Sequence, residues 1–115
     1  MIINLTQHTA TIEQGVFEPQ DKKLCQGLLT FEEIPTIAEI SCRAKALAEI
    51  ATQEGADAAM IGGAPFFMGA LQNALIEMGV KPLFAFSRRE SVDQTQEDGS
   101  VRKVTVFRHL GFVEV

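Results

Sequence analysis

The chain has 115 residues, the length of one domain, and its 46% hydrophobic and 22% charged residues are typical of a globular protein, not a disordered one. No apolar run approaches the roughly 20 residues that span a bilayer, and we expect no signal peptide because the first residues lack its basic and apolar regions. The two cysteines, Cys25 and Cys42, have no metal or redox spacing, so we expect one reduced, cytoplasmic domain over residues 1–115, with both cysteines buried in helices.

The net charge of −5 is unevenly distributed along the chain. Residues 1–80 contain four Lys or Arg and ten Asp or Glu, whereas residues 81–115 contain six and five. An acidic protein repels the phosphates of a duplex, so we expect no duplex nucleic acid as a partner. A small anionic ligand held in one basic pocket is compatible with this charge.

The first thirty residues predict short elements. Met1–Leu5 is apolar and β-branched, which predicts a strand buried on both faces. Thr11–Gln14 matches a capping box, and Gly15 would end the turn of helix that it begins. Residues 16–18 predict a very short strand. Residues 20–30 are ambiguous, because their leucines have helical spacing but Gly27 weakens a helix.

The clearest helix begins after Pro35. Thr36 and Glu39 form a second capping box, and Gly55 is a natural C-terminal cap. Apolar residues recur at spacings of three and four, which predicts one buried stripe. The stripe consists of Ile37, Ile40, Ala44, Leu47 and Ala51.

A strand over residues 57–61 is followed at once by Gly62-Gly63, and Pro65 then suits the first turn of a helix that Gly79 ends. The buried side of this helix should consist of Phe67, Leu71, Ala74, Leu75 and Met78.

The last third of the chain predicts two strands. Residues 82–86 read as a buried strand, and residues 87–100 read as a polar loop containing the turn signal Asp98-Gly99. Residues 101–107 alternate and predict a two-faced antiparallel strand, which Gly111 interrupts. Strands alternating with helices predict an α/β fold, a Rossmann-like three-layer sandwich with a mainly parallel sheet and an antiparallel C-terminal edge strand.

Ligands of open α/β sheets bind at the carboxyl ends of the parallel strands. This rule nominates residues without any alignment, because three sets of side chains follow the three predicted parallel strands. They are Asn4, Thr6, Gln7 and His8 after the first strand, Gly62, Gly63 and Ala64 after the second, and Ser87, Arg88, Arg89, Glu90 and Ser91 after the third.

Two of these sets suit an anion. Gly62-Gly63 would leave free backbone N–H groups at the positive end of a helix, where phosphate binds, although a tight turn also needs glycine. Arg88 and Arg89 could pair with phosphate oxygens, although only one of the two arginines can point inward. Alternatively, both could be solvated and pair with nearby carboxylates. The Lys-Ser/Thr ending of a P-loop and the dinucleotide fingerprint are both absent.

Two histidines could do chemistry. His8 lies within reach of the same edge and could act as a general acid or base, or be an ordinary surface residue. His109 could face the sheet edge or a subunit partner. The sequence contains no serine triad, zinc spacing or carboxylate dyad, so we expect no metal and no cofactor. Phe66 and Met68 would be exposed and could form a dimer surface or a ligand wall.

Three segments carry a resemblance to known proteins: NLTQHTATIEQG at 4–15, AAMIGGAPFFMGALQNALIEMG at 58–79, and the close from Pro82 to Val115. They resemble a group of short bacterial α/β proteins without an assigned activity. The layout is also similar to that of the small CRISPR-associated ring nucleases.

The second resemblance implies a homodimer that binds cyclic oligoadenylate across its two-fold axis. It also implies metal-independent cleavage, in which a ribose 2′-hydroxyl attacks the adjacent phosphate and leaves a 2′,3′-cyclic phosphate. The positions that would carry these roles are Thr6, His8, Arg88 and Arg89.

The sequence therefore predicts a small domain that binds a nucleotide or cyclic oligonucleotide and cleaves it as a metal-independent phosphodiesterase. His8, Arg88 and Arg89 would be catalytic, and the ligand would contact Thr6, Gln7, Gly62, Gly63 and Ser87. One alternative is a non-catalytic module that binds a nucleotide or a phosphorylated metabolite. The other is a protein-interaction subunit.

Overall fold

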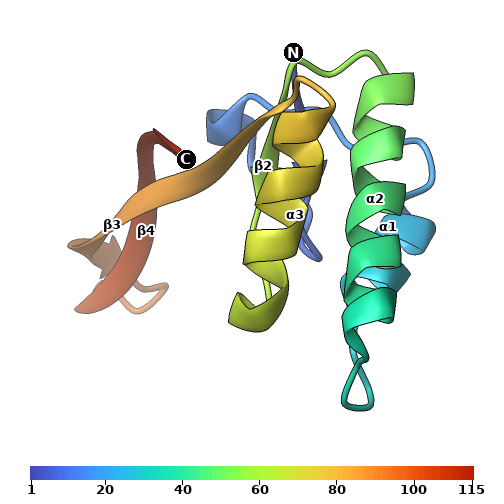
Figure 1. Ribbon diagram of the computed structural model, residues 1–115. Coiled ribbons are helices and arrows are strands. Elements are labelled where there is room, and N and C mark those ends of the chain that lie inside the picture. Colours follow the sequence, from blue (N-terminus) through green and yellow to red (C-terminus); the bar gives the residue numbers. More distant parts are fainter.

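Four strands form one sheet in the order β1-β2-β3-β4, and three α-helices accompany it (Figure 1). The computed structural model describes all residues, 1–115. The pairs β1–β2 and β2–β3 are parallel, whereas β3–β4 is antiparallel, so the predicted α/β fold with an antiparallel C-terminal strand is confirmed. The elements are β1 Ile2–Leu5, η1 Ile12–Gln14, α1 Lys22–Leu28, α2 Ile37–Gln53, β2 Ala58–Ile61, α3 Pro65–Glu77, β3 Lys81–Thr95 and β4 Val101–Glu114.

The short N-terminal elements form where local signals place them. The Thr11–Gln14 capping box is present, and Gly15 ends η1 with a φ of 65°, a left-handed conformation that favours glycine. Phe17 makes a parallel bridge to Ile3, which confirms a very short strand there. The ambiguous segment contains α1, and the Asp21 side chain caps its N-terminus.

Helix α2 begins at the predicted cap, where the Thr36 hydroxyl accepts a hydrogen bond from the Glu39 N–H at 3.1 Å. Ala44, Leu47 and Ala51 are buried as the apolar stripe predicts. Ile37 is 88% exposed, so its assignment to the stripe is wrong. It is the first residue of the helix and stands at the end of the stripe.

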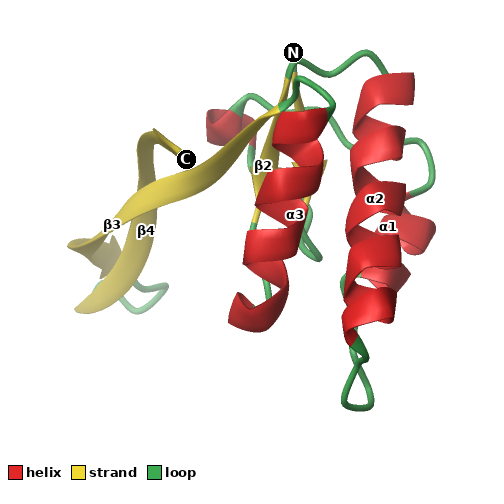
Figure 2. Cartoon of the chain, viewed as in Figure 1, coloured by secondary structure: helices red, strands yellow, loops and turns green.

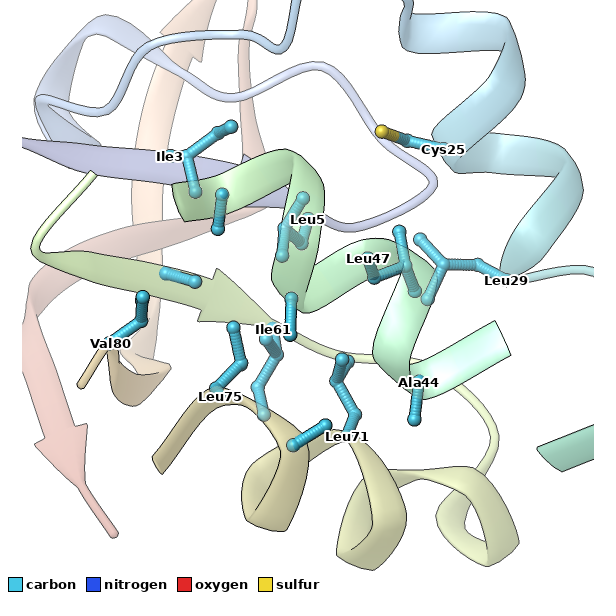
Figure 3. Close-up of a cluster of buried hydrophobic side chains, with 14 of the residues drawn as sticks. Ile3, Leu5, Cys25, Leu29, Ala44, Leu47, Ile61, Leu71, Leu75 and Val80 are labelled. Carbon is cyan, nitrogen blue, oxygen red and sulfur yellow. The ribbon is translucent and has the colours of Figure 1, made fainter. Parts of the chain in front are cut away.

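The hydrophobic core is one cluster to which all three α-helices contribute (Figure 3). The strands supply alternate residues of one sheet face, because side chains alternate between the faces of a strand. The largest fully buried apolar side chains of the cluster are Ile3, Leu5, Leu47, Phe67, Leu71 and Leu75.

Three further expectations about buried or exposed side chains are wrong. Cys25 is buried as predicted, and burial raises the pKa of its thiol, which suits a packing residue; Cys42 is exposed, because it lies on the solvent side of α2. Phe66 is exposed as expected, but Met68 is buried, because it turns toward the β2–α3 connection near Gly63. Met78, expected on the buried side of α3, is 38% exposed at the end of the helix.

The opposite face of the sheet carries Asn4 and Met60, which are both buried. The segment 6–18 covers this face, and its only helical part is the single 3₁₀ turn η1. The second helical layer of the predicted sandwich is therefore reduced to one turn, and this leaves a hollow at the carboxyl ends of β1 and β2.

Strands β3 and β4 extend together as a two-stranded arm, away from α1 and α2 (Figures 1 and 2). The loop predicted at 87–100 is wrong for 87–95, which continues β3, whereas the Asp98-Gly99 turn is confirmed at the tip. Residues 87–95 are mostly polar because this part of β3 is mostly exposed, and only Glu90 and Val92 of it are half-buried. Gly111 lies inside β4, next to a bulge at Phe86/Ser87, and does not interrupt it. The arm accounts for a radius of gyration of 16.8 Å, against about 13 Å for a compact chain of this length.

Hydrogen exchange tests the continuous arm. We expect the ladder amides of residues 88–94 and 102–108 to exchange more slowly than those of the 96–100 turn, because ladder hydrogen bonds must open before exchange. Mass spectrometry of peptides covering each segment measures this difference. Equal exchange rates in the three segments would contradict the continuous strand and support a loop over residues 87–100.

Candidate functional site

A pocket of about 420 Å³ lies at the carboxyl ends of β1 and β2, beside β3, and we call it the carboxyl-edge pocket. It brings together most of the residues that the strand-end rule nominates. The lining residues are Thr6, Gln7, His8, Thr9, Ala10, Thr11, Gln14, Met60, Ile61, Gly62, Gly63, Phe84 and Ala85.

Asn4 holds the rim of this pocket in place. Its side chain is fully buried. The Asn4 amide nitrogen donates to the His8 carbonyl at 2.7 Å and to both carboxylate oxygens of Glu18 at 3.0 Å. The Asn4 side-chain oxygen accepts from the Thr6 N–H at 3.0 Å and the Thr6 hydroxyl at 2.6 Å. Every hydrogen-bonding group of this buried amide is therefore used to shape residues 6–8.

Glu18 and Lys22 complete the same network. The Lys22 ammonium donates to the carbonyls of Thr6 at 2.8 Å and His8 at 3.1 Å, and it forms an ion pair with Glu18 at 2.9 Å. Glu18 also accepts from the Ala10 N–H at 2.9 Å. Sequence analysis missed both residues. The available signal was Asn4 itself, since a polar side chain in a buried strand needs partners.

Ionisation of Glu18 is favoured despite its partial burial. Desolvation opposes the charged form, but the Ala10 N–H, the Asn4 amide and the Lys22 ammonium together lower the pKa of Glu18 below its usual 4.5. The carboxylate is therefore charged near neutral pH and holds the rim by charge-assisted hydrogen bonds.

Gln7 and His8 differ in whether their side chains are free to bind a ligand. The Gln7 side chain donates to the Leu29 carbonyl at 3.1 Å and to the Thr30 hydroxyl at 2.9 Å, so it ties the rim to the end of α1. The His8 side chain is exposed and makes no hydrogen bond within the chain. Among the nominated side chains, His8 is thus the titratable group that a ligand in the pocket could meet.

Gly62 and Gly63 form the side of the pocket that leads into α3. Gly63 has a φ of 148°, which a side chain would strain, whereas a Cβ at Gly62 would meet only the Thr6 methyl at 3.7 Å. The residue that caps α3, Ala64, supplies no side-chain hydrogen bond, and Pro65 is the first helical residue. The amide groups at this positive helix end therefore have no side-chain cap.

None of the lining residues is acidic, although the chain has a net charge of −5. The polar groups of the lining are hydroxyls, amides and one imidazole, and Met60, Phe84 and Ala85 give it an apolar floor. Such a surface can accept an anion without repulsion from a carboxylate in its wall.

Ser87, Arg88 and Arg89 do not line the pocket. They lie on β3 beyond Ala85, where the strand has entered the arm. Arg88 forms an ion pair with Glu90 at 3.0 Å, and the Arg89 guanidinium lies 5.6 Å from the Phe107 ring on the other face. The two arginines thus point to opposite faces, as alternation requires, and the chain does not bring either one to Gly62-Gly63.

His109 lies on the arm, with its ring 4.9 Å from that of Phe112. Its Nδ1 atom is buried without a hydrogen-bond partner. No group of three or more His, Cys, Asp or Glu side chains is placed to hold a metal ion. None of the helices combines the length and the apolar character that a bilayer crossing requires.

The family model described as "Uncharacterized protein MJ1673 family" matches residues 1–113. The chain belongs to this family, which agrees with its resemblance to short proteins without an assigned activity. No curated protein and no solved structure matches the chain.

The lowered pKa of Glu18 predicts how the rim responds to acid. The contribution of Glu18 to the stability of the fold is complete above pH 4.5, the usual pKa of a glutamate. It is lost as the pH falls through the lower pKa that Glu18 has in the folded state. We expect Glu18→Gln to reduce the free energy of unfolding by about 1–2 kcal/mol at pH 7. We also expect it to flatten the loss of stability below pH 4.5.

Urea unfolding at a series of pH values measures both effects. Glu13→Gln is the matched control, because Glu13 forms no ion pair. An acid profile of Glu18→Gln that is parallel to that of the unmodified protein would show that Glu18 does not stabilise the rim.

Proposed function

We propose that this member of the MJ1673 family binds a nucleotide or a cyclic oligonucleotide by its phosphate in the carboxyl-edge pocket. The observation that carries the proposal is the composition of the lining, which has no carboxylate in an acidic protein. The uncapped start of α3 supports it, because backbone N–H groups and the helix dipole attract phosphate.

The rest of a nucleotide also finds suitable chemistry in the pocket. Met60 and Phe84 offer apolar contact to a base, and the hydroxyls of Thr9 and Thr11 offer hydrogen bonds to a ribose. The volume of about 420 Å³ lies within the range of roughly 300–1,000 Å³ of small-ligand sites. The network of Asn4 and Glu18 keeps this lining in place before a ligand arrives.

Two variants of Gly62 test the anion site. Gly62→Asp adds a carboxylate to the pocket wall, and Gly62→Asn adds a neutral side chain of the same shape; the space at Gly62 accepts a Cβ. We expect Gly62→Asp to weaken binding of AMP, ATP or cyclic oligoadenylate at least about tenfold more than Gly62→Asn, because like charges repel at short distance.

Calorimetric titration measures these affinities. The double variant Arg88→Ala/Arg89→Ala distinguishes an anion bound in the carboxyl-edge pocket from one bound by the arginines of the arm. We expect the double arginine variant to bind within about twofold of the unmodified protein, a difference of less than 0.5 kcal/mol. Equal affinities of the Asp and Asn variants, or no binding of any of these nucleotides, would contradict the proposal.

Cleavage of a cyclic oligoadenylate is the second candidate function. The observation that favours it is the free imidazole of His8 at the pocket. In this reaction the ribose 2′-oxygen forms a bond to phosphorus, and the bond from phosphorus to the 5′-oxygen breaks. The proton of the 2′-hydroxyl leaves to a base, and the 5′-oxygen takes a proton. A histidine near neutral pH can serve either transfer.

Product analysis after incubation with cyclic oligoadenylates in EDTA tests cleavage separately from binding. We expect His8→Ala to lower the cleavage rate about 10²–10⁴-fold, the usual contribution of a general acid or base. Binding by His8→Ala should change far less than its rate. Binding without cleavage by the unmodified protein would identify a non-catalytic module and remove this candidate.

A further inference from the structure

The uneven charge of the sequence coincides with a boundary in the structure. The arm and its root occupy residues 81–115, with six basic and five acidic residues. The body occupies residues 1–80, with four basic and ten acidic residues. An arm that projects from an acidic body therefore carries most of the cations of the chain (Figure 1).

One face of the arm carries exposed apolar side chains and two cations against one carboxylate, and we call it the arm face. Alternation places Val101, Lys103, Thr105 and Phe107 of β4 on the same side, together with Arg89 and Asp93 of β3, which pair with Phe107 and Lys103 in the ladder. Phe107 is 68% exposed and Val101 is 63% exposed. Neither Arg89 nor Lys103 forms an ion pair.

The body carries a groove of complementary character, which we call the acidic groove. Its volume is about 620 Å³, and it lies between the loop before α2 and the start of α3. Ile34 is 97% exposed and Phe66 is 55% exposed, and neither Glu32 nor Glu33 forms an ion pair. The groove is lined by Phe31, Glu32, Glu33, Ile34, Pro35, Ile40 and Phe66.

Arg43 and Phe31 hold the acidic groove in shape. The Arg43 guanidinium donates to the Thr30 carbonyl at 2.6 Å and lies 4.4 Å from the Phe31 ring centroid. Phe31 in turn packs edge-on against Phe66 at 5.0 Å and against Phe67 at 5.3 Å. A groove that is ordered in advance loses little conformational entropy when it binds a partner.

We propose that the arm face of one copy docks in the acidic groove of a second copy. Arg89 and Lys103 would meet Glu32 and Glu33, while Phe107 and Val101 would cover Ile34 and Phe66. Charge complementarity favours a second copy as the occupant, because one chain carries both surfaces with opposite charge.

The dimensions of the arm allow this contact. The strand from Ser87 to Thr95 extends about 27 Å at the usual rise per residue. The two shorter extents of the molecule are 32 and 25 Å, so an arm can reach across a neighbouring body. Reciprocal exchange of two arms buries the contact twice and closes a two-fold dimer.

Charge reversal with rescue tests this contact in the full-length protein. Light scattering and sedimentation should show a dimer that dissociates as salt rises, because exposed ion pairs are screened. We expect Arg89→Glu/Lys103→Glu and Glu32→Lys/Glu33→Lys each to raise the dimer dissociation constant at least about tenfold. Combining all four changes in one chain should bring it back to within about threefold of the unmodified protein, because the ion pairs are restored with reversed polarity.

Matched controls isolate the two surfaces. Arg102→Glu reverses a charge on the opposite face of the arm, next to Lys103, and Glu49→Lys/Glu77→Lys reverses two exposed charges of the body outside the groove. These variants should leave the dissociation constant within about threefold. A monomer at every concentration, a dimer that both reversals leave unchanged, or a fourfold variant that stays dissociated would each overturn the proposal.

Discussion

The side chain of Asn4 is the constraint on which the carboxyl-edge pocket depends. It is fully buried in β1, on the sheet face that no α-helix covers, and it must therefore find hydrogen-bond partners within the chain. It finds them in the segment that follows β1 and in Glu18, which Lys22 neutralises. One buried amide thus folds residues 6–18 back over the sheet and leaves a hollow between them and β2.

This arrangement decides which groups a ligand can meet. The chain uses its acidic Glu18 and its basic Lys22 internally, and the Gln7 side chain is bound to the end of α1. What remains around the hollow is hydroxyls, the free imidazole of His8 and the Gly62-Gly63 backbone that leads into α3. Charge is also unevenly divided over the whole molecule, since Glu18 at the pocket rim is paired with Lys22 and six of the ten Lys or Arg residues lie in residues 81–115.

Sequence signals of short range predicted the structure well, and contacts between distant residues were missed. The capping box at Thr11 and the turn at Asp98-Gly99 depend on three or four neighbouring residues, and both form as predicted. Of the capping box predicted at Thr36, the hydrogen bond from the Glu39 N–H forms, whereas the Glu39 carboxylate pairs with Arg43. The continuation of β3 past Phe86 depends on pairing with β4 across the tip, and both faces of the arm meet solvent. No hydrophobic periodicity marks such a strand, so its polar residues resembled a loop.

The candidate site shows the same division. The rule that ligands bind at strand ends nominated Thr6, His8 and Gly62, and these three residues lie in one pocket because the rule depends only on where strands end. It misplaced the two arginines, because the third strand does not end where its apolar run ends. The partners of Asn4 were missed, since Glu18 lies 14 residues further along the chain and only the fold brings the two together.

The central claim is that an anion binds at the acid-free lining that Asn4 holds in place. A titration of the protein with AMP, followed residue by residue through the backbone amide signals in NMR spectra, tests this claim most directly. The account predicts saturable shifts confined to residues 6–11 and to the start of α3 around Gly62, Gly63 and Phe66. Shifts confined to the arm, or no shift anywhere at millimolar AMP, would contradict it.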